Sequence, residues 1–223
     1  MAVRSTVALK VLMAMTGLVM IGFLLMHMFG NLKMFLGAEA FNHYAEWLKG
    51  DILYPLIPEG WFIWIFRAFM LTAIALHIYS AVTLWRRAQA ANPTSYEAKR
   101  RLAQTYSART MRWGGVILAG FLVFHLLQFT VRTALVNASP TATPYEMVIG
   151  EFSVWWLVLA YGLWLVTVCM HVRHGMWSAF ATLGANTSAK ARGVLNGCAW
   201  VIALLLYIGF MIMPVAVLFG WIQ

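Results

Sequence analysis

The hydrophobic pattern of this chain consists of five long apolar stretches separated by short polar segments. The apolar stretches cover about residues 11–36, 61–85, 113–135, 152–174 and 194–222. A helix needs about 20 residues to cross the hydrocarbon core of a bilayer, because each residue adds about 1.5 Å of rise. All five stretches meet that length. The pattern therefore predicts an all-α membrane protein with five transmembrane helices.

The segments between the stretches are short, and one of them has a helical pattern of its own. Phe41, Tyr44, Ala45 and Leu48 fall at helical spacing, which predicts a short helix within residues 37–60. No linker or low-complexity tract interrupts the chain, so we expect residues 1–223 to form a single transmembrane domain. The first stretch also resembles a signal peptide, but its apolar run exceeds the roughly 7–15 residues of a signal core, which favours a retained helix.

Composition supports lipid as the solvent for most of the chain. Apolar residues make up 62% and charged residues 10%, against roughly 45–50% and about 25% in soluble domains. The net charge of +9 does not indicate nucleic-acid binding, because the basic residues are sorted by loop. Most lie near the N-terminus and in residues 86–112 and 173–192, whereas residues 33–60 and 132–151 hold most of the acids. The positive-inside rule then predicts a cytoplasmic N-terminus and an outside C-terminus.

The two cysteines, Cys169 and Cys198, each lie inside an apolar run. They form neither a Cys-x-x-Cys pair nor a Cys-x-x-Cys-His site. We therefore expect no iron–sulfur cluster and no covalently attached haem on this chain.

Four histidines lie well inside the first four stretches, one in each: His27, His77, His125 and His171. One intramembrane histidine is usually functional, although it can also simply hydrogen-bond a neighbouring helix. With the N-terminus inside, His27 and His125 fall in the outer half of the membrane, and His77 and His171 lie toward the inner side. The two levels are about 12 Å apart. This arrangement predicts two bis-histidine b haems in a four-helix bundle, with the fifth helix beside it.

Small residues at repeated offsets favour the haem interpretation. Gly17 and Gly115 each precede a histidine by ten residues, and Ala81 and Gly175 each follow one by four. A flat porphyrin needs positions without bulk on the helices that touch its face. Glycine and alanine are, however, also common at helix contacts in membranes.

Three other residues compete for roles near the haems. His174 lies three residues beyond His171, but at the cytoplasmic border, where water can satisfy it, so His171 is the preferred ligand. His43 lies in an outer loop, which favours a solvated surface residue. Arg67 lies inside the second stretch and needs an anion there, which a haem propionate would supply. Reaching out to the lipid headgroups is the equally weighted alternative.

These features resemble the single-chain, di-haem cytochrome b membrane anchor of succinate:menaquinone reductases and quinol:fumarate reductases. The resemblance covers essentially the whole chain. It rests on His27 in HMFGNLKMFLGAEAFNHYAEWL, His77 in ALHIYSA, His125 in LVFHLLQF and His171 in MHVRHGMWSAFATLG. Five spans, with the ligands on the first four, is the plan of that family.

The resemblance implies a subunit that carries electrons from succinate to menaquinone through two b haems in a bacterial cytoplasmic membrane. It implies two partners on the cytoplasmic side, a flavoprotein with FAD and an iron–sulfur protein, and it leaves open a higher oligomer of the complex. Alone, the chain would not oxidise succinate. Some fumarate-reducing members have glutamates where this chain has Cys169 and Lys49, which favours succinate oxidation over the alternative of quinol:fumarate reduction.

Two further functions stay open from the sequence. The first is a di-haem cytochrome b that serves another membrane dehydrogenase, such as a hydrogenase or a formate dehydrogenase. The second is a haem-free transporter or proton channel with the four histidines as relays.

A quinone site is expected near the outer haem. Asn31 and Lys33 lie one to two turns beyond His27, and the adjoining loop adds His43 and Glu46. Asn31 could donate to a quinone carbonyl, while Glu46 or His43 could relay protons. These residues could instead merely solvate the helix end. The rival site is the cytoplasmic side, where Arg4, Lys10 and Arg173 gather.

Overall fold

The structure is a computed structural model that describes residues 5–91 and 106–223. Over these ranges it is helical and contains no strand. Some residues behind the predicted orientation lie outside the described part of the chain, namely Arg4, Glu97, Lys99, Arg100 and Arg101.

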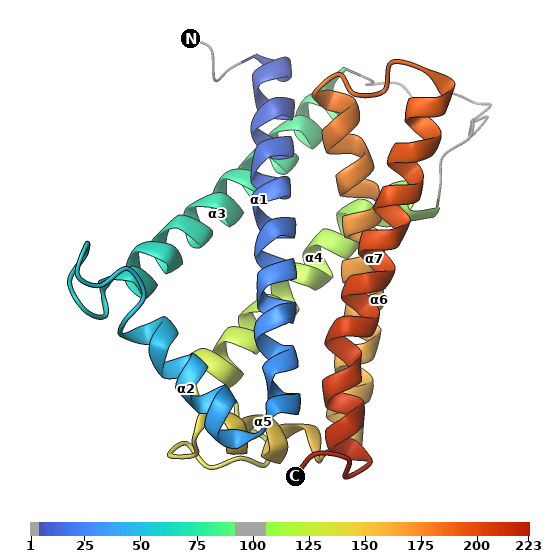
Figure 1. The fold of residues 1–223 in the computed structure, drawn as a ribbon. Coiled ribbons are helices and arrows are strands. Elements are labelled where there is room, and N and C mark those ends of the chain that lie inside the picture. The colour runs from blue at the N-terminus through green and yellow to red at the C-terminus, as the bar shows by residue number, and fades with distance from the viewer. Residues whose placement is uncertain (1–4, 92–105) are drawn as a thin grey trace.

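Five helices are long and apolar enough to cross a membrane, which confirms the predicted all-α fold. They are α1 (Thr6–Leu32), α3 (Trp61–Ala90), α4 (Tyr106–Leu126), α6 (Trp155–Thr182) and α7 (Ala189–Leu218). A 3-10 turn, η2 (Lys33–Leu36), extends α1, and a π-helical turn, η3 (Leu127–Val131), extends α4. The start of α1 and the α6–α7 connection lie at one end of the molecule, here called the amino-terminal end (Figure 1).

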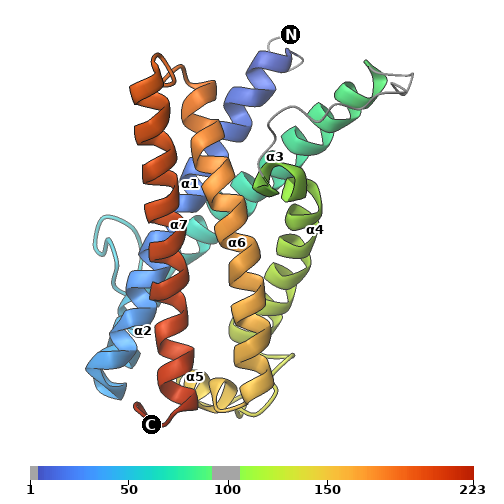
Figure 2. The same ribbon diagram turned by 90° about the vertical axis from the view of Figure 1, so that its right-hand side faces the viewer.

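The opposite end, here called the carboxy-terminal end, holds the C-terminus and two short helices (Figure 1). These are α2 (Ala38–Lys49) and α5 (Pro144–Phe152). Helices α6 and α7 lie side by side, and α3 and α4 run obliquely to them (Figures 1 and 2). Helix α1 packs against α3, α6 and α7, while α6 packs against α1, α4 and α7. Helix α6 therefore lies at the centre of the packing.

The short helix expected in the first loop is present as α2, but the sequence reading missed α5. Helix α5 begins with a capping box, in which the backbone N–H of Glu146 donates to Thr143 Oγ1 and the Thr143 N–H donates to Glu146 Oε2. Pro144 occupies the first helical position. The Glu146 carboxylate accepts hydrogen bonds from the backbone N–H and the hydroxyl of Thr143, and these two bonds hold the pKa of the carboxyl below its ordinary value. The capping box and proline are sequence signals that predict this helix start.

Two helix boundaries differ from the approximate stretch boundaries, because the backbone turns inside the apolar pattern. The third stretch was expected to reach residue 135, but Arg132 adopts a left-handed conformation that ends the helix after Val131. The fourth was expected to start at Phe152, which instead ends α5. Val154 is extended, and α6 begins at Trp155.

Candidate haem site

The four intramembrane histidines come together as two facing pairs. The ring centroids of His27 on α1 and His125 on α4 lie 5.9 Å apart. Those of His77 on α3 and His171 on α6 lie 6.3 Å apart. These are the two pairs expected from the sequence. We call them the His27–His125 pair and the His77–His171 pair.

The spacing of both pairs fits two imidazoles bound to opposite sides of one iron. An iron–nitrogen bond of about 2 Å, plus about 1.2 Å from nitrogen to ring centre, separates two axial imidazole centroids by about 6.4 Å. The helix pairs that carry facing histidines, α1 with α4 and α3 with α6, are not among the extensively packed pairs of the described helices. Each pair therefore bridges two helices that do not pack closely on each other.

Each pair stands without a third ligating side chain among the residues that the structure describes. Among the described residues, no group of three or more histidine, cysteine, aspartate or glutamate side chains could hold a metal ion. A structural zinc site needs four protein ligands. Haem needs only two, because the porphyrin supplies the four equatorial nitrogens. The donor sets present therefore fit haem better than a bare metal ion.

A backbone carbonyl fixes the tautomer of His77. Its Nδ1 lies 3.2 Å from the Met13 carbonyl oxygen, which can only accept, so Nδ1 carries the proton and donates. Thr16 Oγ1 lies 3.2 Å from the same nitrogen. A ring that donates from Nδ1 keeps an unprotonated Nε2, which is the state that binds a metal.

A side chain does the same for His125. Its Nδ1 lies 3.2 Å from the hydroxyl oxygen of Tyr161. That hydroxyl donates its only proton to Gln128 Oε1, at 2.6 Å. The Tyr161 oxygen must therefore accept from His125 Nδ1–H. The Nε2 of His125 is thereby left unprotonated.

The two remaining histidines are held mainly by packing. His27 stacks on Phe23 at a centroid distance of 5.4 Å and contacts Phe210 at 5.6 Å. The Nδ1 of His171 is buried without a hydrogen-bond partner. Among the ring contacts of the described residues, the ring that faces His77 is that of His171 and not that of His174.

Two of the small residues singled out in the sequence lie against the His77–His171 pair. A Cβ added to Gly17 would lie 3.4 Å from Cε1 of His77, and one added to Gly115 would lie 3.9 Å from Cε1 of His171. Each glycine thus sits at the level of the other pair, and not at that of the histidine on its own helix. By contrast, a Cβ on Gly175 would meet nothing within 4 Å.

Arg67 lies in the second turn of α3, toward the carboxy-terminal end. Its Cζ is 4.8 Å from the ring centroid of Trp64, which is 66% exposed. The guanidinium therefore lies against an outward-facing indole. Its role as a propionate partner stays a prediction.

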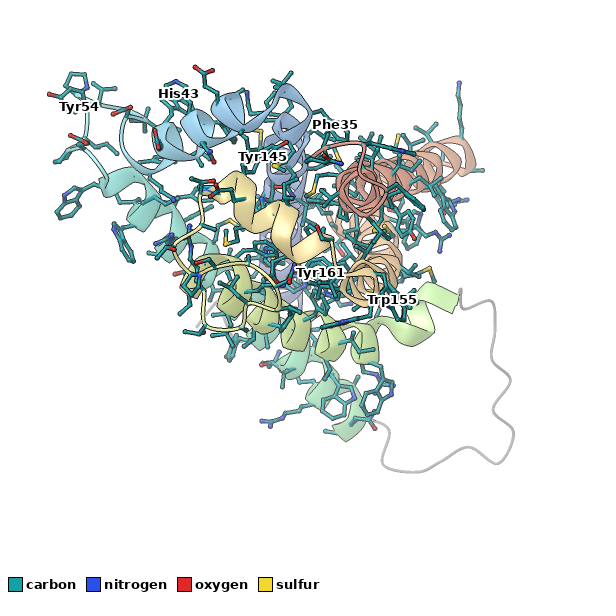
Figure 3. All side chains as sticks on the ribbon, turned by 90° about the horizontal axis from the view of Figure 1, so that it is seen from below. Phe35, His43, Tyr54, Tyr145, Trp155 and Tyr161 are labelled. Carbon is teal, nitrogen blue, oxygen red and sulfur yellow. The ribbon has the colours of Figure 1, made fainter. Side chains whose placement is uncertain are left out.

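The four quinone-site candidates gather near the junction of α1 and α2 without forming one cluster. Asn31 lies in the last turn of α1, and Lys33 Nζ lies 4.8 Å from the ring centroid of Tyr44. His43 and Glu46 are exposed on α2. Figure 3 shows His43 at the periphery, away from the bundle. Tyr44 turns inward, because a Cβ on Gly30 would lie 3.1 Å from its ring.

Sequence reasoning missed three residues that a chain of hydrogen bonds connects to His125. They are Tyr161, Gln128 and Glu151, all of which are buried. Glu151 had been counted only as an acid of an outer loop. A polar residue inside an apolar stretch is a functional signal in a membrane protein, and Gln128 and Tyr161 carry that signal in the sequence.

We compared the chain with family models, with curated proteins and with solved structures, and no match was found.

Proposed function

We propose that this multi-pass helical membrane protein is a di-haem cytochrome b that carries electrons. His27 and His125 would hold one haem, and His77 and His171 the other. One observation carries this proposal: the four imidazoles form two facing pairs, with ring-centroid distances of 5.9 and 6.3 Å. When bound, haem b supplies a one-electron redox couple inside the hydrocarbon.

The residues of this chain would orient and shield the bound groups. Met13 and Tyr161 hold His77 and His125 in the tautomer that presents Nε2. Phe23 and Phe210 pack on His27 and surround it with apolar rings. An apolar surround of this kind limits water access, which is one of the means by which proteins tune redox potentials.

We further propose that the electrons come from succinate and reduce menaquinone. In this role the chain is the membrane anchor of a succinate dehydrogenase with a flavoprotein and an iron–sulfur subunit. The sequence resemblance supports this assignment. The amino-terminal end, predicted to be cytoplasmic, also has basic side chains for docking an acidic surface, among them Arg86, Arg87, Lys190 and Arg192. Positive-inside topology alone would place bases there as well.

An optical spectrum of the purified chain tests the haem proposal. We expect a dithionite-reduced minus oxidised spectrum with a b-type α-band, and a pyridine haemochrome assay that gives about two haems per chain. A chain that folds in the membrane fraction but shows no α-band would contradict the proposal and favour a haem-free relay. Co-purification of succinate dehydrogenase activity would support the finer role, whereas another co-purifying dehydrogenase would replace it.

A quinone site at the carboxy-terminal end makes a separate prediction. With both haems retained, Asn31→Ala and Glu46→Gln should lower quinone reduction about tenfold, because they remove a donor to a carbonyl and a proton relay. The measurement is succinate-driven quinone reduction in membranes, with a quinone-analogue inhibitor titration. The exposed acid Glu39, in the first turn of α2, provides the control Glu39→Gln. Unchanged rates and inhibition would shift attention to the amino-terminal end, near Lys10 and Arg173.

A further inference from the structure

A buried polar network links the His27–His125 pair to the loop at the carboxy-terminal end. It contains His125 on α4, Tyr161 on α6, Gln128 on η3 and Glu151 on α5. Gln128 and Glu151 are fully buried, with 0% exposure, and Tyr161 is 5% exposed. Figure 3 shows Tyr161 in the interior of the bundle when it is viewed from this end. Burying these groups is costly unless each is hydrogen-bonded.

The proton positions in this network form one consistent set. His125 Nδ1–H donates to the Tyr161 oxygen, and the Tyr161 hydroxyl donates to Gln128 Oε1. The amide nitrogen of Gln128 donates to Glu151 Oε2. The Gln128 side chain, with both its amide atoms bonded, therefore has only one workable orientation. This orientation decides which way the Tyr161 hydroxyl points.

Glu151 anchors the far end of the network to the backbone. Its carboxylate accepts backbone N–H groups from Val136, Asn137 and Ala138, each at 2.9 Å to Oε1. The loop approaches α5 so closely that a Cβ on Gly150 would lie 3.1 Å from Cα of Ala138. A carboxylate held by several backbone donors is fixed in place. The position of Glu151 is thus fixed, and it determines the orientation of the Gln128 amide and, through it, of the Tyr161 hydroxyl.

We infer that Glu151 and Gln128 are positioning residues for His125 and act on it through the Tyr161 hydroxyl. This inference rests on the proposed function, in which His125 is an axial ligand. The network keeps Nδ1 of His125 protonated and donating, so that Nε2 is the nitrogen without a proton. A hydrogen bond from Nδ1 also makes the ligand more basic. A more basic ligand favours the ferric state, so the network lowers the potential of the haem bound at this pair.

The test is the reduction potential of this haem in Tyr161→Phe, which removes the acceptor oxygen and keeps the ring. A redox titration followed in the α-band should resolve two one-electron steps in the wild type, and the step absent from His27→Ala belongs to this pair. In Tyr161→Phe, the midpoint potential of that step should rise by about 59 mV, which corresponds to a tenfold change in the ratio of reduced to oxidised haem. The step of the His77–His171 pair should not move.

A reciprocal exchange tests the role of the two distant residues. In Glu151→Gln, the amide oxygen can still accept from the backbone, but the amide nitrogen then faces the Gln128 amide nitrogen and cannot accept from it. Gln128 therefore loses its fixed orientation, and we expect the same upward shift of the potential or a selective loss of this haem. In the double variant Glu151→Gln with Gln128→Glu, the carboxylate now at position 128 accepts from the Tyr161 hydroxyl. The amide now at position 151 donates from its nitrogen to that carboxylate, and its oxygen accepts from the backbone N–H groups. The potential should return to the wild-type value or below it.

Tyr145→Phe is the matched control. Tyr145 is buried in the same apolar cluster as Tyr161, and its hydroxyl donates to the Gln223 carbonyl and not to a histidine. This variant should leave both potentials unchanged. An unmoved potential in Tyr161→Phe, or an exchange variant that does not recover from Glu151→Gln, would overturn the inference. If the wild type holds no haem, it is the proposed function that fails.

Discussion

Replacing His27 with alanine should remove one of two haems and leave the other in place. His27 and His125 face each other at 5.9 Å, and neither pair has a third ligating side chain among the described residues that could take over. The haem-to-chain ratio should fall from about two to about one, because haem needs both axial histidines. His125→Ala should lose the same spectral component. His77→Ala and His171→Ala should lose the other one.

Two further histidines serve as controls for this series. His43 is exposed on α2, so His43→Ala should retain both haems. His174 lies one turn from His171 on α6, and His174→Ala should also retain both. Loss of a haem in His174→Ala, with none lost in His171→Ala, would show that the ligand on α6 is wrongly assigned.

A bulky residue at Gly17 should exclude the haem of the His77–His171 pair. Gly17 on α1 faces His77, and an added Cβ would lie at an ordinary contact distance of 3.4 Å from its Cε1. Gly17→Ala should therefore be tolerated, whereas the three further carbons of Gly17→Leu would enter the space beside the imidazole. We expect the haem-to-chain ratio of Gly17→Leu to fall to about one, with the His27–His125 component retained.

Gly22→Leu is the matched control for this substitution. Gly22 lies on the same helix, and a Cβ there would meet nothing within 4 Å. This variant should keep both haems. Equal haem content in Gly17→Leu and the wild type would show that the space next to His77 is not needed for haem.

The fold could be predicted from the sequence where a single physical signal decides it. Five apolar stretches long enough to span hydrocarbon led directly to α1, α3, α4, α6 and α7. Their ends could not be placed as well, because helix ends depend on local backbone conformation and on capping. The left-handed Arg132 shows this: its guanidinium donates to the carbonyls of Pro140 and Ala142, so the backbone turn at this helix end depends on how the following loop folds back.

The candidate site was predictable in its histidines and not in their surroundings. Spacing along each helix indicates depth, so His27 could be matched with His125 from sequence alone. The partner of an imidazole Nδ1 depends instead on how neighbouring helices are rotated. Tyr161 reaches His125 from α6, and Met13 reaches His77 from α1, and no local pattern predicts either contact.

The pairing of alternate spans has a consequence for how the protein is made. A complete transmembrane helix lies between the two members of each pair: α3 between His27 and His125, and α4 between His77 and His171. During synthesis from the N-terminus, the first pair is therefore complete only after α4 has emerged, and the second only after α6. Under the proposed function, haem delivery would follow insertion of these helices. A nascent chain arrested before α6 would contain both proposed ligands of one haem and one of the two proposed for the other.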